Sequence, residues 1–165
     1  MGKLASEKYL SIYSNSNLKC TSLRLFNVYG ENQNFSNLKQ GMISIYLSMA
    51  LKNGKIQVKG SKDRFRDFIE INDVIKAILF LLNTPQKNSN ETYNISTGNK
   101  TMVKKVIKLI LQYLNTNIDV SYSGSTPGDQ FGIYGNNKKI KMLGWNPEIE
   151  FESGLKNLIL KIKNE

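Results

Sequence analysis

The chain has no histidine, a single cysteine and no long hydrophobic run. Without histidine, a Ser-His-Asp triad and a Cys/His zinc site are both excluded. Acid–base chemistry must therefore come from tyrosine, lysine or carboxylate side chains, or from a segment outside these 165 residues. The lone Cys20 cannot form an internal disulfide and favours a reducing, cytoplasmic location. The most apolar stretch, residues 77–82, is far shorter than the roughly 20 residues that cross a bilayer, so we expect no membrane span.

Acidic residues are also scarce, with 13 Asp and Glu against 23 Lys and Arg, which gives a net charge of +10. Such an excess is typical of proteins that bind nucleic acid or other anionic ligands. However, only Arg24, Arg64 and Arg66 are arginines, and the lysines are scattered along an asparagine-rich chain. We interpret the charge as a compositional bias with solvated lysines on helix faces, and expect no nucleic-acid partner.

Apolar periodicity predicts strands that alternate with helices. Helices are expected at residues 5–13, 42–52, 74–83, 103–114, 138–143 and 151–163, and strands at 20–26, 55–60, 65–71, 92–96 and 118–122. Gly54 and Gly144 are expected to end two of the helices. Asn72 or Asp73 is expected to cap the third helix, and Thr101 the fourth. The alternation predicts an α/β fold.

Six short motifs occur in a characteristic order along the chain. They are GKLASE at 2–7, LRLFNVYG at 23–30, RDFIEINDV at 66–74, YNISTG at 93–98, PGD at 127–129 and LGWNP at 143–147. Each is weak alone, but together they resemble the C-terminal half of the extended short-chain dehydrogenase/reductases, specifically the NAD-dependent nucleotide-sugar epimerases and dehydratases. The resemblance covers essentially the whole chain. It implies the C-terminal portion of an NAD(P)-binding Rossmann-like fold with a smaller substrate-binding subdomain.

The resemblance also implies how the chain is divided. Residues 1–30 and 65–115 would end the Rossmann domain, and residues 31–64 and 116–165 would form the interleaved substrate-binding subdomain. The family's N-terminal half carries a glycine-rich turn over the NAD pyrophosphate. The glycines between 124 and 135 do not lie in a βα turn, so they do not form that motif. We therefore expect a substrate-binding part without the NAD-binding half, inactive by itself.

Lys3 matches the lysine of the family's catalytic Tyr-x-x-x-Lys pair, whose tyrosine would lie one residue before Met1. By resemblance, Lys3 is a catalytic residue that lowers the tyrosine pKa, so that the phenolate acts as a base. The same lysine is expected to hydrogen-bond the nicotinamide ribose of NAD. Leu25 and Phe26, at the carboxyl end of a strand, are expected to approach the nicotinamide.

The substrate-binding residues that the resemblance implies are Asn27, Gly41, Met42, Ile43, Val58, Arg66 and Asp129. Asn27 would contact the diphosphate or the sugar, and residues 41–43 would open a helix whose backbone amides face the nucleotide. Val58 would line the base pocket. Arg66 would pair with the diphosphate, a task suited to the planar guanidinium, and Asp129 would hold a ribose hydroxyl.

Two positions depart from the family pattern. Thr126 stands where the family often has an arginine before Pro-Gly-Asp, and Glu70 replaces a histidine that often follows Arg-Asp-Phe-Ile. The first change removes a cation that clamps the diphosphate. Lys100 or Arg64 would then have to take over that contact.

The resemblance predicts a UDP-sugar 4-epimerase-like function in carbohydrate biosynthesis, with a sugar hydroxyl oxidised to a keto intermediate and then reduced. A nucleotide-sugar 4,6-dehydratase or reductase shares these motifs and stays open. A third alternative is a non-catalytic module for nucleotide-sugar binding or dimerisation. Without a Rossmann half, the sheet would expose an apolar edge, so we expect a homo-oligomer, in the family a dimer.

Overall fold

The computed structural model describes residues 2–15, 17–34, 41–84, 90–125, 128 and 130–164. The helices are α1 (Gly2–Tyr13), α2 (Met42–Asn53), α3 (Ile71–Leu82), α4 (Val103–Leu114), α5 (Lys138–Leu143) and α6 (Phe151–Asn164). The strands are β1 (Thr21–Leu25), β2 (Asn27–Tyr29), β3 (Lys55–Lys59), β4 (Phe65–Arg66), β5 (Phe68–Glu70), β6 (Glu91–Ile95), β7 (Thr101–Met102), β8 (Asp119–Ser123) and β9 (Gly132–Ile133). The α/β fold class predicted from the sequence is confirmed.

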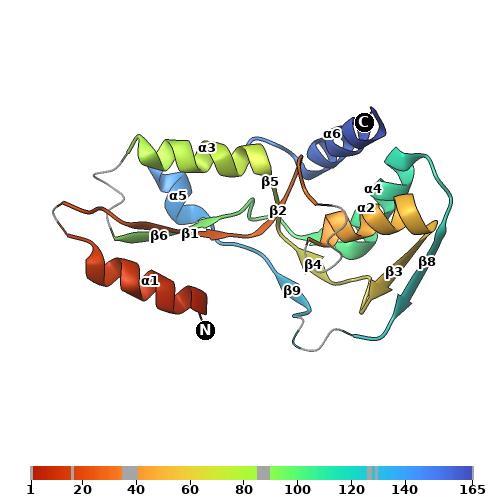
Figure 1. Ribbon diagram of the computed structural model, residues 1–165, viewed down its shortest axis with the longest axis horizontal. Helices are drawn as coiled ribbons and strands as arrows, with labels where there is room; N and C mark the ends of the chain where they lie inside the picture. Colours follow the sequence, from red (N-terminus) through yellow and green to blue (C-terminus); the bar gives the residue numbers. More distant parts are fainter. Residues whose placement is uncertain are drawn as a thin grey trace.

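The elements form two lobes along the long axis of the molecule (Figure 1). The first lobe has the parallel pair β1–β6 at its centre, with α3 and α5 on one side and α1 on the other. The second lobe holds α2, α4, α6 and the parallel pair β3–β8. The parallel pair β2–β5 lies between the lobes, and β4 pairs with β7 in antiparallel and β9 in parallel orientation.

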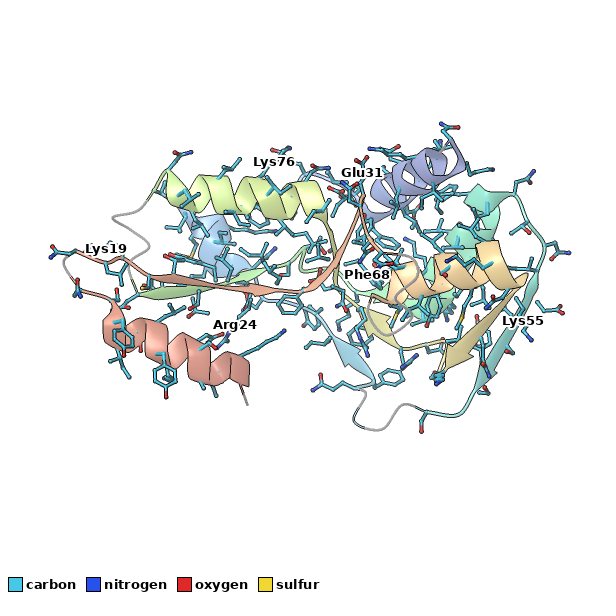
Figure 2. All side chains as sticks on the ribbon, in the orientation of Figure 1. Lys19, Arg24, Glu31, Lys55, Phe68 and Lys76 are labelled. Carbon is cyan, nitrogen blue, oxygen red and sulfur yellow. The ribbon has the colours of Figure 1, made fainter. Side chains whose placement is uncertain are left out.

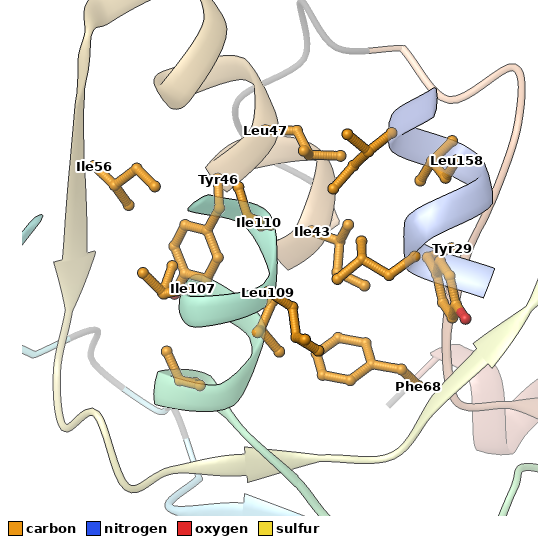
Figure 3. Packing of buried hydrophobic residues seen from close by; sticks show 14 of the residues in the cluster. Tyr29, Ile43, Tyr46, Leu47, Ile56, Phe68, Ile107, Leu109, Ile110 and Leu158 are labelled. Atoms are coloured by element: carbon orange, nitrogen blue, oxygen red, sulfur yellow. The ribbon is translucent and has the colours of Figure 1, made fainter. Parts of the chain in front are cut away.

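Each lobe has its own hydrophobic core. The first-lobe core consists of Ile69, Val74, Ala77, Leu81, Tyr93, Ile95, Ile140 and Trp145. The second-lobe core is larger and includes Leu47, Ile56, Val58, Val106, Ile110, Leu155 and Ile159, none of which is accessible to solvent (Figure 3). Burying a side chain of this size contributes about 1.5–3 kcal/mol, so these clusters provide the main stabilisation of each lobe.

Packing groups the segments differently from the division expected from the family. The apolar stripe of α4 packs against α2 and α6 in the second lobe, although residues 65–115 were expected to belong to the Rossmann part. In turn, α5 packs on β6 in the first lobe, although residues 116–165 were expected in the other subdomain. The expected domain boundaries stay a prediction.

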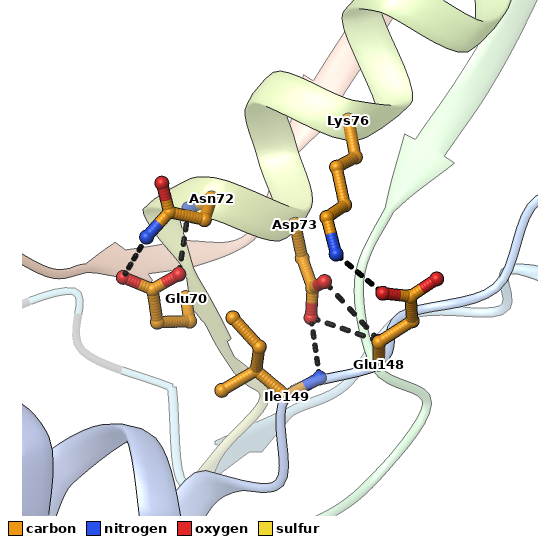
Figure 4. A network of polar contacts seen from close by, with 6 residues as sticks. All are labelled: Glu70, Asn72, Asp73, Lys76, Glu148 and Ile149. Atoms are coloured by element: carbon orange, nitrogen blue, oxygen red, sulfur yellow. Dashed lines mark hydrogen bonds and ion pairs between the residues drawn. The ribbon is translucent and has the colours of Figure 1, made fainter.

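The helix ends agree with the sequence at two glycines and differ at two caps. Gly54 and Gly144 end α2 and α5 in the left-handed conformation, as predicted. The cap of α3 is Glu70, whose carboxylate accepts from the Asn72 N–H at 2.6 Å, so neither Asn72 nor Asp73 caps this helix. Asp73 instead accepts from the backbone N–H groups of residues 148 and 149 (Figure 4).

The prediction that Thr101 caps α4 is also wrong. Thr101 lies in β7 opposite Arg66, and Met102 precedes the helix without a side-chain cap bond. The orphan N–H of Val103 donates instead to the carbonyl oxygen of Arg64, at 2.8 Å. The neighbouring strand therefore replaces the cap, because its carbonyl groups satisfy the helix end.

None of the α1 residues is buried. Among the described residues, no helix combines the length and the apolar character that a membrane crossing requires.

Candidate functional site

The candidate site lies where β1 passes into β2, at the junction of the two lobes. Asn27 is fixed there by two bonds to one acceptor: its backbone N–H and its Nδ2 each donate to the carbonyl oxygen of Asp67, at 3.1 Å. The parallel register places Asn27 opposite Phe68. Phe68 occupies the middle of the molecule (Figure 2). Polar groups at the carboxyl end of a parallel strand are well placed for ligands.

A pocket of about 440 Å³ opens beside Asn27. Its lining residues are Lys3, Phe26, Asn27, Val28, Tyr29, Gln33, Gly41, Met42, Ile43 and Phe68. The structure thus brings together six of the residues predicted from the sequence: Lys3, Phe26, Asn27, Gly41, Met42 and Ile43. They come from α1, the β1–β2 junction and the start of α2, which are far apart along the chain. We call this cavity the junction pocket.

The N-terminus of α2 forms one wall of the junction pocket. Gly41 precedes this helix with φ 80° and ψ 100°, a conformation that favours glycine. Among the residues that the structure describes, no side chain caps the helix, and its first turn carries no acidic residue. The helix dipole therefore stays uncompensated within these residues, and the Lys3 side chain adds a second positive charge at the pocket. This wall suits an anionic ligand group.

Leu25 and Val58 lie away from the junction pocket. Leu25 is 49% exposed and lines a groove of about 700 Å³ between α1 and β1, together with Lys3. Val58 is fully buried in the second-lobe core. Lys3 borders both the groove and the junction pocket.

Arg66 is also outside the lining of the junction pocket. Arg66 is 7% exposed, and its guanidinium donates to the backbone carbonyls of Phe65 at 2.7 Å and Gln130 at 2.9 Å. Burial is the main cause that lowers the pKa of Arg66, followed by the nearby Arg64. The side chain therefore anchors the segment at residue 130. Asp129 and Thr126 lie outside the described residues.

The two cations considered as substitutes for the missing family arginine are held elsewhere. Arg64 donates to the carbonyl oxygens of Ser61, at 3.2 Å, and Lys59. The ammonium of Lys100 lies 4.5 Å from the ring centroid of Tyr134. Lys100 also lines a different cavity, of about 710 Å³, and Phe68 lines both this cavity and the junction pocket.

Asp67 supports the site, and sequence reasoning gave it no role beyond the motif. Its carboxylate is fully buried and accepts from the N–H and hydroxyl of Thr97, at 2.9 and 2.6 Å. It also accepts from the N–H groups of Gly98, at 2.8 Å, and Gly135, at 3.1 Å. One carboxylate therefore ties two distant segments, at residues 97–98 and at residue 135, to the strand junction that carries Asn27. Nothing in the sequence around Gly98 and Gly135 indicated that their backbone N–H groups would donate to Asp67.

Comparison with known proteins shows the family to which this fold belongs. The NAD dependent epimerase/dehydratase family matches residues 1–96, which is more than half of the chain. The chain belongs to this family, and the family membership predicted from the sequence is confirmed.

Individual relatives share the similarity over nearly the whole chain. A putative UDP-glucose 4-epimerase of Methanocaldococcus jannaschii is 33% identical over 165 residues, which cover 99% of this chain and 52% of that protein. The dTDP-4-dehydro-6-deoxyglucose reductase of Escherichia coli is 30% identical, with 99% and 51% covered. The crystal structure of a Thermotoga maritima UDP-glucose 4-epimerase with UDP-glucose superimposes with a TM-score of 0.88 at 29% identity, covering 98% of this chain and 52% of that one. The chain thus spans about half the length of the relatives it matches.

Proposed function

We propose that this chain is the substrate-binding half of an NAD-dependent nucleotide-sugar epimerase, with a UDP-sugar as substrate. The observation that carries the proposal is the junction pocket, which gathers Lys3, Phe26, Asn27 and the start of α2 around one cavity. The chain is similar to a protein whose crystal structure contains UDP-glucose, which supports this substrate class.

The pocket residues divide the work of binding by their chemistry. The uncapped N-terminus of α2 provides backbone N–H groups and a positive potential for the diphosphate. Asn27, immobilised through its Nδ2, presents its remaining amide oxygen to a sugar hydroxyl. Phe26 and Met42 supply apolar walls that exclude water from the sugar. Arg66 and Asp129 stay expected contacts of the diphosphate and of the ribose.

The residues of this chain fit one end of NAD. Lys3 and Leu25 border the groove beside the junction pocket, where Lys3 would hold the nicotinamide ribose. The sequence has no glycine-rich βα turn for the pyrophosphate. NAD supplies a reversible hydride acceptor when it is bound. Lys3 would also lower the pKa of a neighbouring tyrosine base through its positive charge.

Titration calorimetry with UDP-glucose and with NAD tests the proposal. We expect the chain to bind UDP-glucose without NAD, to bind NAD more weakly, and to show no turnover alone. Asn27→Ala should weaken UDP-glucose binding about three- to tenfold, because one hydrogen bond is lost. Lys8→Met, an exposed change on α1, is the control and should bind like the wild type. Catalytic turnover by this chain alone, or no affinity for UDP-glucose, would contradict the proposal.

A reductase is the second candidate, favoured by the 30% identity to the Escherichia coli reductase. Both reactions would use the same junction pocket and differ in acid–base groups supplied by the NAD-binding half. Mixing this chain with the corresponding half of the Methanocaldococcus jannaschii relative separates them. Interconversion of UDP-glucose and UDP-galactose supports the epimerase, and reduction of a dTDP-4-keto sugar supports the reductase. UDP-glucose binding with neither activity supports the non-catalytic module.

A further inference from the structure

Gln33 lines the junction pocket, although no motif drew attention to it. It lies in the loop after β2, with no periodicity around it. Its amide lies against the start of α2: a Cβ built on Gly41 would be 3.0 Å from Gln33 Nε2 and 3.0 Å from Ser44 Oγ. Because Gly41 has no side chain, the Gln33 amide can occupy the space beside it.

In the part of the chain that the structure describes, the amide oxygen of Gln33 is buried and has no hydrogen-bond partner. A buried acceptor without a donor is unfavourable, and nearly all such groups in folded proteins are paired. The terminal torsion of a glutamine side chain is broad, so the amide can turn its oxygen toward the cavity without leaving Gly41. An unsatisfied acceptor at a ligand pocket is a recognition element for a donor on the ligand.

The chemistry of the acceptor defines which ligand group it takes. A diphosphate carries no donor hydrogen at neutral pH, so it cannot satisfy an amide oxygen. A hydroxyl of the sugar or ribose, or an N–H of the base, can. The positive wall of the pocket, from Lys3 and the α2 N-terminus, would attract the charged part of the same ligand.

We propose that Gln33 is a positioning residue for the nucleotide-sugar, and that its amide oxygen accepts a hydrogen bond from a neutral donor of the ligand. This role rests on the proposed function of the junction pocket. It differs from the role of Lys3 and of the α2 N-terminus because Gln33 accepts from a neutral hydroxyl or N–H group and does not bind charge. The ligand supplies a donor to an amide oxygen that is unsatisfied in the free protein. Gln33 therefore contributes to affinity without stabilising the free fold.

Two measurements on the same variant test this role. In Gln33→Met the shape is kept and the acceptor is lost. We expect its UDP-glucose affinity by calorimetry to fall about three- to tenfold, because one hydrogen bond to the ligand is missing. Its urea unfolding midpoint should be no lower than that of the wild type, because no bond of the free protein is broken. Gln57→Met, on the exposed face of β3, is the matched control and should leave the affinity unchanged.

The outcomes separate this inference from the proposed function. If wild type and Gln33→Met bind UDP-glucose equally, the role of Gln33 is overturned and the proposed function stands. If the unfolding midpoint of Gln33→Met falls, Gln33 is structural and the inference is overturned as well. If the wild-type chain does not bind UDP-glucose, both are overturned.

Discussion

At the residue scale, the site depends on a buried carboxylate that does not line the junction pocket. Asp67 lies between Arg66 and Phe68, and its backbone carbonyl fixes both the N–H and the side chain of Asn27. Its carboxylate holds Thr97, Gly98 and Gly135. Bonds to an ionised acceptor are about twice as strong as neutral ones. The position of Asn27 is therefore set by the same residue that closes the loops around it.

Asp67→Asn should destabilise the chain by about 2 kcal/mol, because a buried donor loses its acceptor and the new amide hydrogens face N–H groups. Urea unfolding followed by circular dichroism measures the change. Asp63→Asn is the matched control, since Asp63 pairs with Lys104 in an exposed salt bridge, and such pairs contribute little. Equal stability of Asp67→Asn and wild type would contradict the importance of this carboxylate.

The sequence predicted the identity of the pocket residues better than their bonds. Lys3, Phe26, Asn27 and residues 41–43 were assigned by resemblance, and the structure brings them to one cavity. The role of Gln33 could not be predicted, because an isolated amide in an aperiodic loop has no pattern. The donors to Asp67 come from residues that lie 30 or more positions away, so only the folded chain reveals them.

At the scale of elements, one tyrosine joins β2 to α6. The Tyr29 hydroxyl donates to the carbonyl oxygen of Phe151 at 3.4 Å, and the two rings lie 5.5 Å apart. Gly154 makes this approach possible, since a Cβ there would be 2.3 Å from the Tyr29 hydroxyl. Burial, and then the nearby carboxylates of Glu70 and Asp73, raises the pKa of Tyr29 above its ordinary value.

This contact predicts a loss of stability at alkaline pH. The folded state keeps the Tyr29 phenol neutral, whereas the unfolded chain ionises it near pH 10. The stabilisation is therefore complete below about pH 10 and is lost as the pH rises toward the folded-state pKa. Urea unfolding at a series of pH values should show this decline, and Tyr29→Phe should make it shallower. An identical slope for the variant would contradict the assignment, since Tyr46, Tyr93 and Tyr122 remain in both proteins.

The elements themselves were predictable where local chemistry decides them. Glycine ends α2 and α5 because its backbone adopts the left-handed conformation without strain. The caps of α3 and α4 were mispredicted because Glu70 outcompetes Asn72, and because the carbonyl of Arg64 satisfies the first N–H of α4. The short strands β2, β7 and β9 lacked any periodic signal, because two or three residues are too few for one.

At the scale of the whole molecule, one face of the first lobe is apolar and open. In the described part of the chain, β1 pairs with β6 alone, so no strand covers its other edge. On one side of β1, α1 exposes Leu4, Tyr9, Leu10, Ile12 and Tyr13. On the other side, α3 exposes Ile78, Leu79 and Leu82. Strand edges and apolar patches of this kind favour association.

We expect the isolated chain to self-associate through this face. Size-exclusion chromatography with light scattering should give a mass that rises with concentration toward a dimer or larger species. Ile12→Lys should shift the chain toward monomer without loss of stability, because α1 buries no residue. Met142→Lys, at an 87% exposed position on α5, is the matched control and should change nothing. A monomer at all concentrations would contradict the expectation.

The pairing of the strands also determines when the chain can fold during its synthesis. Thr21 lies opposite Glu91, and Lys55 lies opposite Asp119, so both parallel pairs close long loops. Such non-local topology folds slowly, since loop entropy is lost before contacts compensate. The second-lobe core also needs Leu155 and Ile159 of α6. A nascent chain on the ribosome therefore exposes α2 and β3 without all of their partners until α6 has been synthesised, a window in which chaperones would be required.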